Sequence, residues 1–258
     1  MRSGRRTDWR LWRESSLRAK VDVIFTPWGT APALAAKHAT ATIPIVIGGA
    51  GDPVRAGIVA SLTRPGRNVT GLSSLALELE GKRLELAREL VPTVSRVGTF
   101  WHSENPYSAL ASKEVEAAAR ALGVRLHTAR LAASSDLDTA FATLKRERVE
   151  ALALHGYVAT LQHRRAIIDF AAANRLPAIY PLREFAEEGG LLAYGANVAD
   201  ISRRAAHYVD RILRGGKAAD LPVEQATTVE LVVNLRTAKT LGVTIPPSIL
   251  VRAEQVIE

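Results

Sequence analysis

The sequence predicts an α/β fold in which parallel sheets are flanked by helices and the chain is divided into two lobes. Two observations carry this prediction. From Val21 onward, short strand-like segments alternate with helical segments of about ten to fifteen residues. The alternation begins again after Pro92, which gives two runs of elements. The 258 residues, 47% of them hydrophobic, are enough for one large core or two smaller ones.

The first run of elements lies between Val21 and Pro92. Its first two strands are rich in β-branched residues, and the helix between them tolerates Pro32 in its first turn. Leucines recur at helical spacing before Pro92, so a long helix ends there. In order, we expect a strand over 21–29, a helix over 31–41, a strand over 43–49, a helix over 53–63, a strand over 68–74 and a helix over 78–92.

The second run continues the same pattern, with Gly123 at a position where helices commonly end. In order, we expect a strand over 96–103, a helix over 105–123, a strand over 124–131, a helix over 135–148, a strand over 149–156, a helix over 161–175 and a strand over 176–181. The chain then ends with a strand over 190–195, a helix over 199–214, a strand over 227–234 and a helix over 236–241.

Strands separated by helices of this length form parallel sheets with helices on both faces, so we expect two Rossmann-like lobes. The first run is short beside the second. We expect lobe one to contain residues 1–74 and 196–226, and lobe two to contain residues 96–195 and 227–258. A helix over 75–95 is expected to link them.

The charge of the chain is concentrated at its start. The formal net charge is +8, but residues 1–20 hold seven basic and two acidic residues, which leaves the remainder nearly balanced. Nucleic-acid binding would depend on this segment alone, so we expect no nucleic-acid partner. No run of eighteen apolar residues occurs, and no apolar stretch follows Arg5-Arg6, so we expect neither a transmembrane segment nor an export signal.

The residues needed for catalysis are missing from the sequence. The chain has no cysteine, which excludes disulfides, thiol nucleophiles and thiolate metal ligands. Its six histidines lack metal-ligand spacing, and no Gly-x-Ser-x-Gly motif is present. We therefore expect no catalytic site, no metal site and no cofactor.

A glycine-rich segment over 48–51 lies between an expected strand and an expected helix, as phosphate-binding loops do. A phosphate loop needs lysine followed by serine or threonine at the helix start, and a dinucleotide fingerprint needs glycine at position 54. This sequence instead has Asp52, Pro53 and Val54. Two interpretations of Asp52 stay open: a helix N-cap, or a cap that also lines a ligand cleft and favours an ammonium group.

Polar and aromatic side chains follow several of the other strands. The carboxyl ends of parallel strands are where open α/β sheets bind small molecules. A tryptophan or tyrosine there either packs between elements or contacts an apolar ligand, and both interpretations stay open. The strand-end residues are Trp28, Thr30, His102, Ser103, Glu104, Asn105, His155, Tyr157 and Tyr180.

Three motifs give the sequence its identity: Asp-Pro-Val at 52–54, Pro-Gly-Arg-Asn-Val-Thr-Gly at 65–71, and Asn-Leu-Arg-Thr-Ala-Lys-Thr-Leu-Gly-Val-Thr-Ile-Pro-Pro at 234–247. With them, the chain from about Val21 to its end resembles the solute-binding proteins of ATP-binding-cassette importers. It is most similar to the family that includes tryptophan and tyrosine binders. The resemblance implies a type I periplasmic-binding-protein fold whose two lobes close on a small organic solute, with an aromatic amino acid among the candidates.

The resemblance also implies a permease partner, a periplasmic or extracytoplasmic location, and which residues face the cleft. These are Gly29-Thr30-Ala31, Asp52 and Ser103-Glu104-Asn105. Two departures stand out. Family members often carry an acid after the strand that matches 151–156, where this chain has Tyr157-Val158-Ala159, and this weakens the case for an ammonium held by lobe two. Members also open with a signal and a strand–helix–strand unit, so we expect lobe one to miss that unit through a late start codon or a truncation.

Two other functions compete with solute binding. The effector-binding domain of a transcription regulator shares this fold, but it would carry a helix-turn-helix in front, for which residues 1–20 are too short. An enzyme on a doubly wound fold would need a nucleophile and a base, and no such pair is evident.

Overall fold

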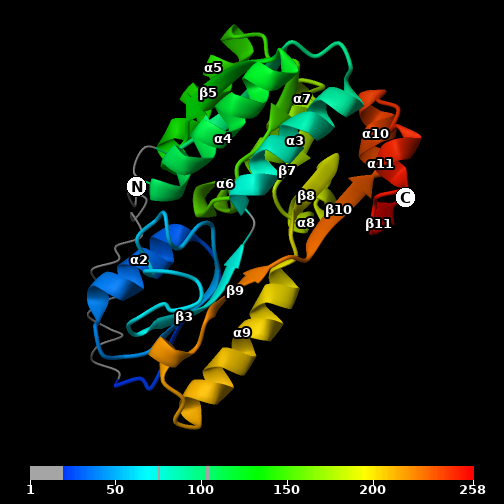
Figure 1. Cartoon of the computed structure of the whole chain (residues 1–258). Helices are drawn as coiled ribbons and strands as arrows, with labels where there is room; N and C mark the ends of the chain where they lie inside the picture. The colour runs from blue at the N-terminus through cyan, green and yellow to red at the C-terminus, as the bar shows by residue number, and fades with distance from the viewer. Residues whose placement is uncertain (1–19, 75, 103–104) are drawn as a thin grey trace. The chain divides into compact units, whose positions relative to one another are not determined.

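The structure, a computed structural model, describes residues 20–74, 76–102 and 105–258 (Figure 1). The chain divides into two compact units. Unit 1 draws on Met1–Leu75, Asn105–Tyr107 and Val198–Thr228, and unit 2 on Ala76–Glu104, Ser108–Asn197 and Val229–Glu258. Within the described ranges, no helix is both long and apolar enough to cross a membrane.

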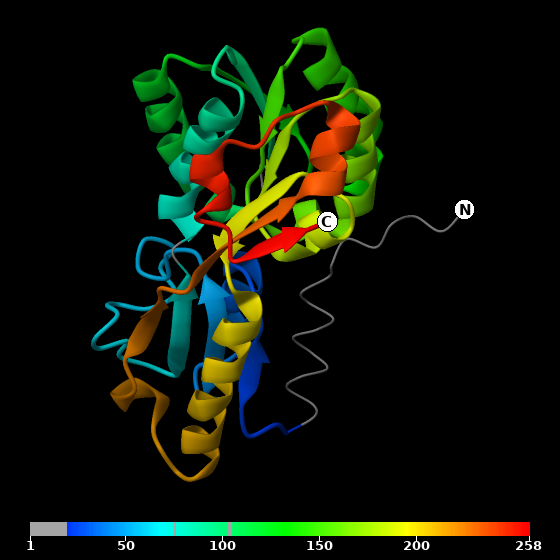
Figure 2. The same cartoon turned by 90° about the vertical axis from the view of Figure 1, so that its right-hand side faces the viewer.

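Unit 1 is built on a four-stranded parallel sheet in the order β1-β2-β3-β9. Helices α2 (Thr30–Ala39) and α9 (Val198–Leu213) lie on opposite sides of this sheet, as Figures 1 and 2 agree. Central strand β2 is accordingly buried along its whole length. The strands are β1 (Ile24–Thr26), β2 (Ile45–Ala50), β3 (Val69–Ser74) and β9 (Val223–Ala226), and a 3-10 turn, η2, covers Ala218–Asp220.

The prediction of a helix over 53–63 is wrong. The segment forms turns, in which the carbonyls of Asp52 and Pro53 accept the N–H groups of Ala56 and Ile58 at 2.9 and 2.7 Å. Gly57 has a φ of +70°, which ends the first turn as a left-handed residue ends a helix. Ile58 and the next residue are then buried in the core of unit 1 instead of continuing a helix.

Unit 2 is built on a seven-stranded sheet in the order β11-β10-β8-β7-β6-β4-β5. All neighbours are parallel except β10 and β8, which run antiparallel. Figure 2 shows β8, β10 and β11 together at one side of this sheet. The strands are β4 (Arg96–Trp101), β5 (Arg125–Arg130), β6 (Ala151–Ala153), β7 (Ala178–Tyr180), β8 (Leu192–Ala196), β10 (Val229–Asn234) and β11 (Gln255–Ile257).

Helices cover both faces of this sheet, and the alternation of side chains in β4 shows how. Val97 faces a cluster with residues of α3 and α4, whereas Phe100 faces Phe141 of α5 at 6.0 Å. Phe141 in turn stacks on Phe170 of α7 at 4.3 Å. The helices are α3 (Ala76–Leu90), α4 (Pro106–Leu122), α5 (Leu137–Arg146), α6 (Val158–Gln162), α7 (Arg164–Ala173), α8 (Arg183–Glu187), α10 (Leu235–Leu241) and α11 (Pro247–Leu250), with 3-10 turn η1 over Ser134–Asp136.

The parallel α/β architecture predicted from the sequence is confirmed, with differences in individual elements. Helix α3, expected to link the lobes, belongs to unit 2, where Leu84 and Leu86 are buried in two different core clusters. The helix expected over 161–175 is divided at His163 into α6 and α7. Sequence analysis did not predict β9, α8, α11 or β11, all of which have five residues or fewer.

The motifs that carry the resemblance have structural roles. The side-chain amide of Asn68 donates to the carbonyls of Thr40 and Ile43 at 3.1 and 2.8 Å, which ties the loop before β3 to the loop before β2. Asn234 caps α10 by accepting the N–H of Thr237 at 3.0 Å, and Gly242 ends that helix at a φ of +71°. These motifs therefore position turns and helix ends.

Candidate ligand-binding residues

The strand ends of unit 1 bring Trp28 and Thr30 close to the glycine-rich segment. A Cβ on Gly49 would lie 2.7 Å from the ring of Trp28, so the glycine leaves room for the indole. The hydroxyl of Thr30, at the start of α2, accepts the N–H of Gly51 at 3.3 Å. Ala31 follows in the first turn and is half-buried. The carboxyl ends of β1 and β2 thus place an aromatic ring, a hydroxyl and the backbone of the glycine-rich segment together.

Asp52 has the geometry of a cap, although no helix follows it. Its Oδ1 accepts the N–H groups of Val54 and Arg55 at 3.1 and 2.9 Å. Oδ2 lies 3.9 Å from Arg55 Nε, and 28% of the side chain remains exposed. The cap therefore stabilises a turn, and the carboxylate as a whole stays partly exposed. Whether it binds a ligand stays a prediction.

The predicted residues of unit 2 and of the start of α4 differ in their surroundings. Ser103 and Glu104 lie outside the described residues. Asn105 begins α4 by accepting the N–H of Tyr107 at 3.1 Å. Tyr180 is buried and stacks on Phe185 at 4.8 Å, which is the packing alternative left open above. A ligand contact by Tyr180 stays a prediction.

A buried ionic cluster at the end of β6 is the feature that sequence analysis missed. His155 Nδ1 lies 2.7 Å from Glu80 Oε2, and Arg83 Nη2 lies 2.6 Å from Glu80 Oε1 without the alignment of a hydrogen bond. Arg83 Nη1 donates to the carbonyl of Tyr194 at 3.0 Å. All three charged or titratable side chains are at most 3% exposed. A signal existed: Glu80 falls in the same helical stripe as Leu77, Leu84 and Ala87.

Tyr157 lies beside this cluster and is also buried. Its ring meets that of His102 edge to face at 5.9 Å, and its backbone N–H donates to the carbonyl of His155 at 3.3 Å. Burial raises the pKa of the Tyr157 hydroxyl, so the group stays protonated at neutral pH. Among the described residues, neither His155 Nε2 nor Arg83 Nε has a hydrogen-bond partner.

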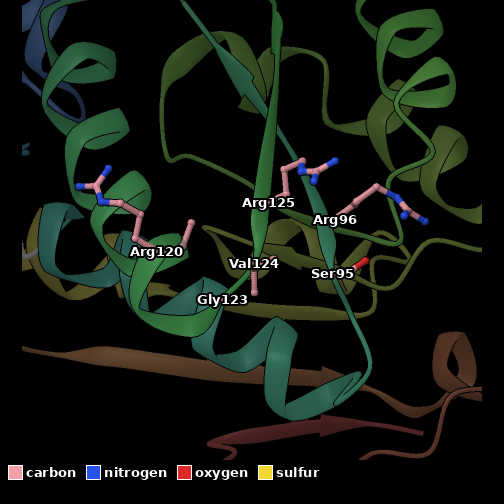
Figure 3. Close-up of a pocket in the computed structure, with 7 residues that line it drawn as sticks. Ser95, Arg96, Arg120, Gly123, Val124 and Arg125 are labelled. Carbon is pink, nitrogen blue, oxygen red and sulfur yellow. The ribbon is translucent and has the colours of Figure 1, made fainter.

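A separate pocket of about 360 Å³ lies at the amino ends of β4 and β5, and Figure 3 shows its lining. Arg96, Arg120 and Arg125 contribute to it, but the guanidinium of Arg120 points away from the other two (Figure 3). Arg96 is already ion-paired with Glu150 at 2.5 Å. The cations do not converge on one ligand, and the predicted ligand-binding residues lie elsewhere.

Metal binding finds no support in the described ranges, because they contain no group of three or more His, Asp or Glu side chains that could hold an ion. The buried cluster has one histidine and one carboxylate, with an arginine on the same carboxylate.

Comparison with known proteins gives consistent matches. A family model described as ABC transporter substrate binding protein matches residues 15–257. A tyrosine-binding protein of Clostridioides difficile is 27% identical over 222 residues, which cover 86% of this chain and 63% of that protein. The chain therefore spans less than two thirds of that relative's length.

Two solved structures share the fold closely. A conserved domain protein of Vibrio cholerae matches with a TM-score of 0.87 at 28% identity, covering 96% of this chain and 82% of that one. A Streptococcus pneumoniae ABC domain in complex with L-Trp matches with a TM-score of 0.87 at 24% identity, covering 96% of this chain and 85% of the other.

Proposed function

Because this chain belongs to the ABC transporter substrate binding protein family, we propose that it binds an aromatic amino acid and delivers it to the permease of an importer. Members of the family bind solutes and are not enzymes, and they act outside the cytoplasm. The observation that carries the choice of ligand is that two relatives, matched over most of this chain, bind tyrosine and tryptophan. The family match favours this function over a transcription regulator.

The chemistry of the strand ends supports the same ligand class. Trp28 supplies an aromatic surface, and Thr30 and Asn105 supply polar groups. The partly exposed carboxylate of Asp52 has the charge that an α-ammonium group requires. The ligand-binding residues we propose are Trp28, Thr30, Ala31, Asp52, Ser103, Glu104, Asn105, Tyr157 and Tyr180.

A thermal-shift screen of the full chain against the twenty amino acids and a set of sugars tests this function. Tryptophan and tyrosine are expected to raise the melting temperature, because a ligand at 100 times its Kd stabilises the folded state by about 2.7 kcal/mol. Isothermal titration then measures the Kd. The proposal would be contradicted if only sugars raised the melting temperature, or if none of the aromatic amino acids did.

Two substitutions at Asp52 separate its capping role from a binding role. Asp52→Ala removes the cap and is expected to lower the free energy of unfolding by about 0.5–2 kcal/mol. Asp52→Asn keeps an oxygen that accepts the N–H groups of Val54 and Arg55, so its stability should stay close to wild type. If Asp52 holds the ammonium, both variants lose affinity for the amino acid by about tenfold or more. Unchanged affinity of the asparagine variant would leave only the cap.

A further inference from the structure

The net charge of the chain belongs to one of its two units. Unit 2 contains eighteen basic and eighteen acidic residues, whereas unit 1 contains sixteen basic and eight acidic residues. The whole formal charge of +8 is therefore in unit 1. An excess of one charge bears on association with oppositely charged partners and not on the fold.

Three segments of unit 1 come together at the amino ends of its strands. The four strands are parallel, so their amino ends share one edge of the sheet. Helix α9 ends beside this edge, because the Tyr208 hydroxyl bonds the carbonyl of Pro222 just before β9. The N–H of Val223 donates to the carbonyl of Leu62 at 2.7 Å, which brings the loop before β3 there as well. In Figures 1 and 2 the last turn of α9 and the chain leading into β1 both lie at the lower end of unit 1.

We call these segments, residues 20–23, 61–68 and 210–222, the basic edge. They contain three acids and six exposed cations, which are Lys20, Arg64, Arg67, Arg211, Arg214 and Lys217. Among the described residues, Arg214 alone of the six is ion-paired, with Asp210 at 2.9 Å. By contrast, the other three described arginines of unit 1, Arg55, Arg203 and Arg204, all have acidic partners. The charge of the basic edge is therefore left for a partner outside the unit.

Exposed aliphatic side chains accompany the cations and indicate what kind of anion fits. Leu213, between Arg211 and Arg214, is 59% exposed, and Val21, next to Lys20, is 36% exposed. An anionic bilayer matches both features, because its phosphates attract cations and its headgroup boundary accepts aliphatic side chains. Nucleic acid has no such apolar layer, and the basic edge contains no aromatic residue on which a base could stack.

We propose that the basic edge binds the surface of an anionic phospholipid membrane. Residues 1–19, which precede Lys20 in the chain, add six basic and two acidic residues to the same unit. Trp28 and Asp52 follow the carboxyl ends of β1 and β2, at the opposite edge of the sheet, so membrane contact leaves them free for a solute. The inference does not depend on which solute the protein binds.

Co-sedimentation of the full chain with lipid vesicles tests the proposal. The chain is expected to bind vesicles made of equal parts phosphatidylcholine and phosphatidylglycerol, and not vesicles of phosphatidylcholine alone. Binding should weaken strongly between about 0.1 M and about 1 M NaCl, because the Debye length falls from about 10 Å to about 3 Å.

Replacing Arg64, Arg211 and Lys217 together by glutamine removes three cations of the basic edge. A cation near an anionic surface strengthens binding about fivefold, so this triple variant should bind the anionic vesicles at least about tenfold more weakly than wild type. All three side chains are exposed, so the melting temperature and the affinity for tryptophan and tyrosine should stay as in wild type.

The matched control replaces Lys113, Arg120 and Arg125 by glutamine, which removes the same charge from exposed positions of unit 2. Its vesicle binding should stay close to that of wild type. Equal losses in the two triple variants would show that net charge alone attracts the membrane, and the inference would be wrong. Failure of wild type to bind the anionic vesicles would also overturn it, whereas titration with amino acids, which needs no membrane, tests the proposed function separately.

A short DNA duplex distinguishes a membrane surface from a general site for polyanions. Leu213→Ser should weaken binding to anionic vesicles, because the leucine enters the headgroup boundary, and its melting temperature should not fall, because the side chain is exposed. If wild type binds the duplex as tightly as the vesicles, and Leu213→Ser changes neither affinity, the assignment to a membrane is wrong.

Discussion

Replacement of Glu80 by alanine is expected to lower the free energy of unfolding by about 3–5 kcal/mol, because it leaves the buried cation of Arg83 without its counter-charge. His155 Nδ1 loses its acceptor in the same change. Urea unfolding followed by circular dichroism measures the loss, which would be a large part of the stability of a domain.

Two comparisons make this expectation specific to the buried pair. Glu78→Ala removes an exposed carboxylate from the first turn of the same helix and should change stability by about 0.5 kcal/mol or less. Replacing both Glu80 and Arg83 by methionine should recover part of the stability lost in Glu80→Met alone, since no charge then stays buried. A Glu80→Ala variant as stable as Glu78→Ala would show that the cluster is hydrated in solution.

Gly71→Ala is expected to destabilise unit 1 by about 4 kcal/mol, the combined effect of backbone strain and overpacking. Gly71 lies in β3 at a φ of +123°, opposite Ile47 of the central strand. A Cβ at this position would lie 2.2 Å from the carbonyl oxygen of Ile47, a backbone atom that cannot move aside without breaking the sheet. The expected result is a marked fall in the urea midpoint, or loss of soluble protein.

Gly57→Ala is the control for this second prediction. Gly57 also has a positive φ, of +70°, but no atom lies within 4 Å of an added Cβ. Gly57→Ala should lower the free energy of unfolding only by the strain of a left-handed alanine, about 1–2 kcal/mol. If both substitutions lowered the free energy of unfolding equally, the contact of the added Cβ with Ile47 would not be destabilising, contrary to the geometry.

The alternation of strands and helices could be predicted from the sequence because the spacing of apolar residues within each segment depends on its secondary structure and on which face is buried. The fully buried run at Ile45–Ala50 and the leucine spacing of α3 predicted the parallel α/β architecture correctly. The motif around Asn234 was also readable, since it acts through a local bond at a helix start, whereas Asn68 bonds the backbone of residues 25 and 28 positions earlier in the chain. Such local signals determined the fold and the family.

Tertiary structure decided the features that no local signal encodes. An apolar segment over 53–63 became turns because Gly57 ends the first one and Ile58 is buried in the core. Strand β9 exists only because β3 provides the edge to which it pairs. Glu80 meets His155 across 75 residues of chain, through the packing of α3 beside β6. Charged residues acquire their surroundings from such distant neighbours, so the sequence by itself determined the scaffold, and the packing decided which charged side chains meet in its core.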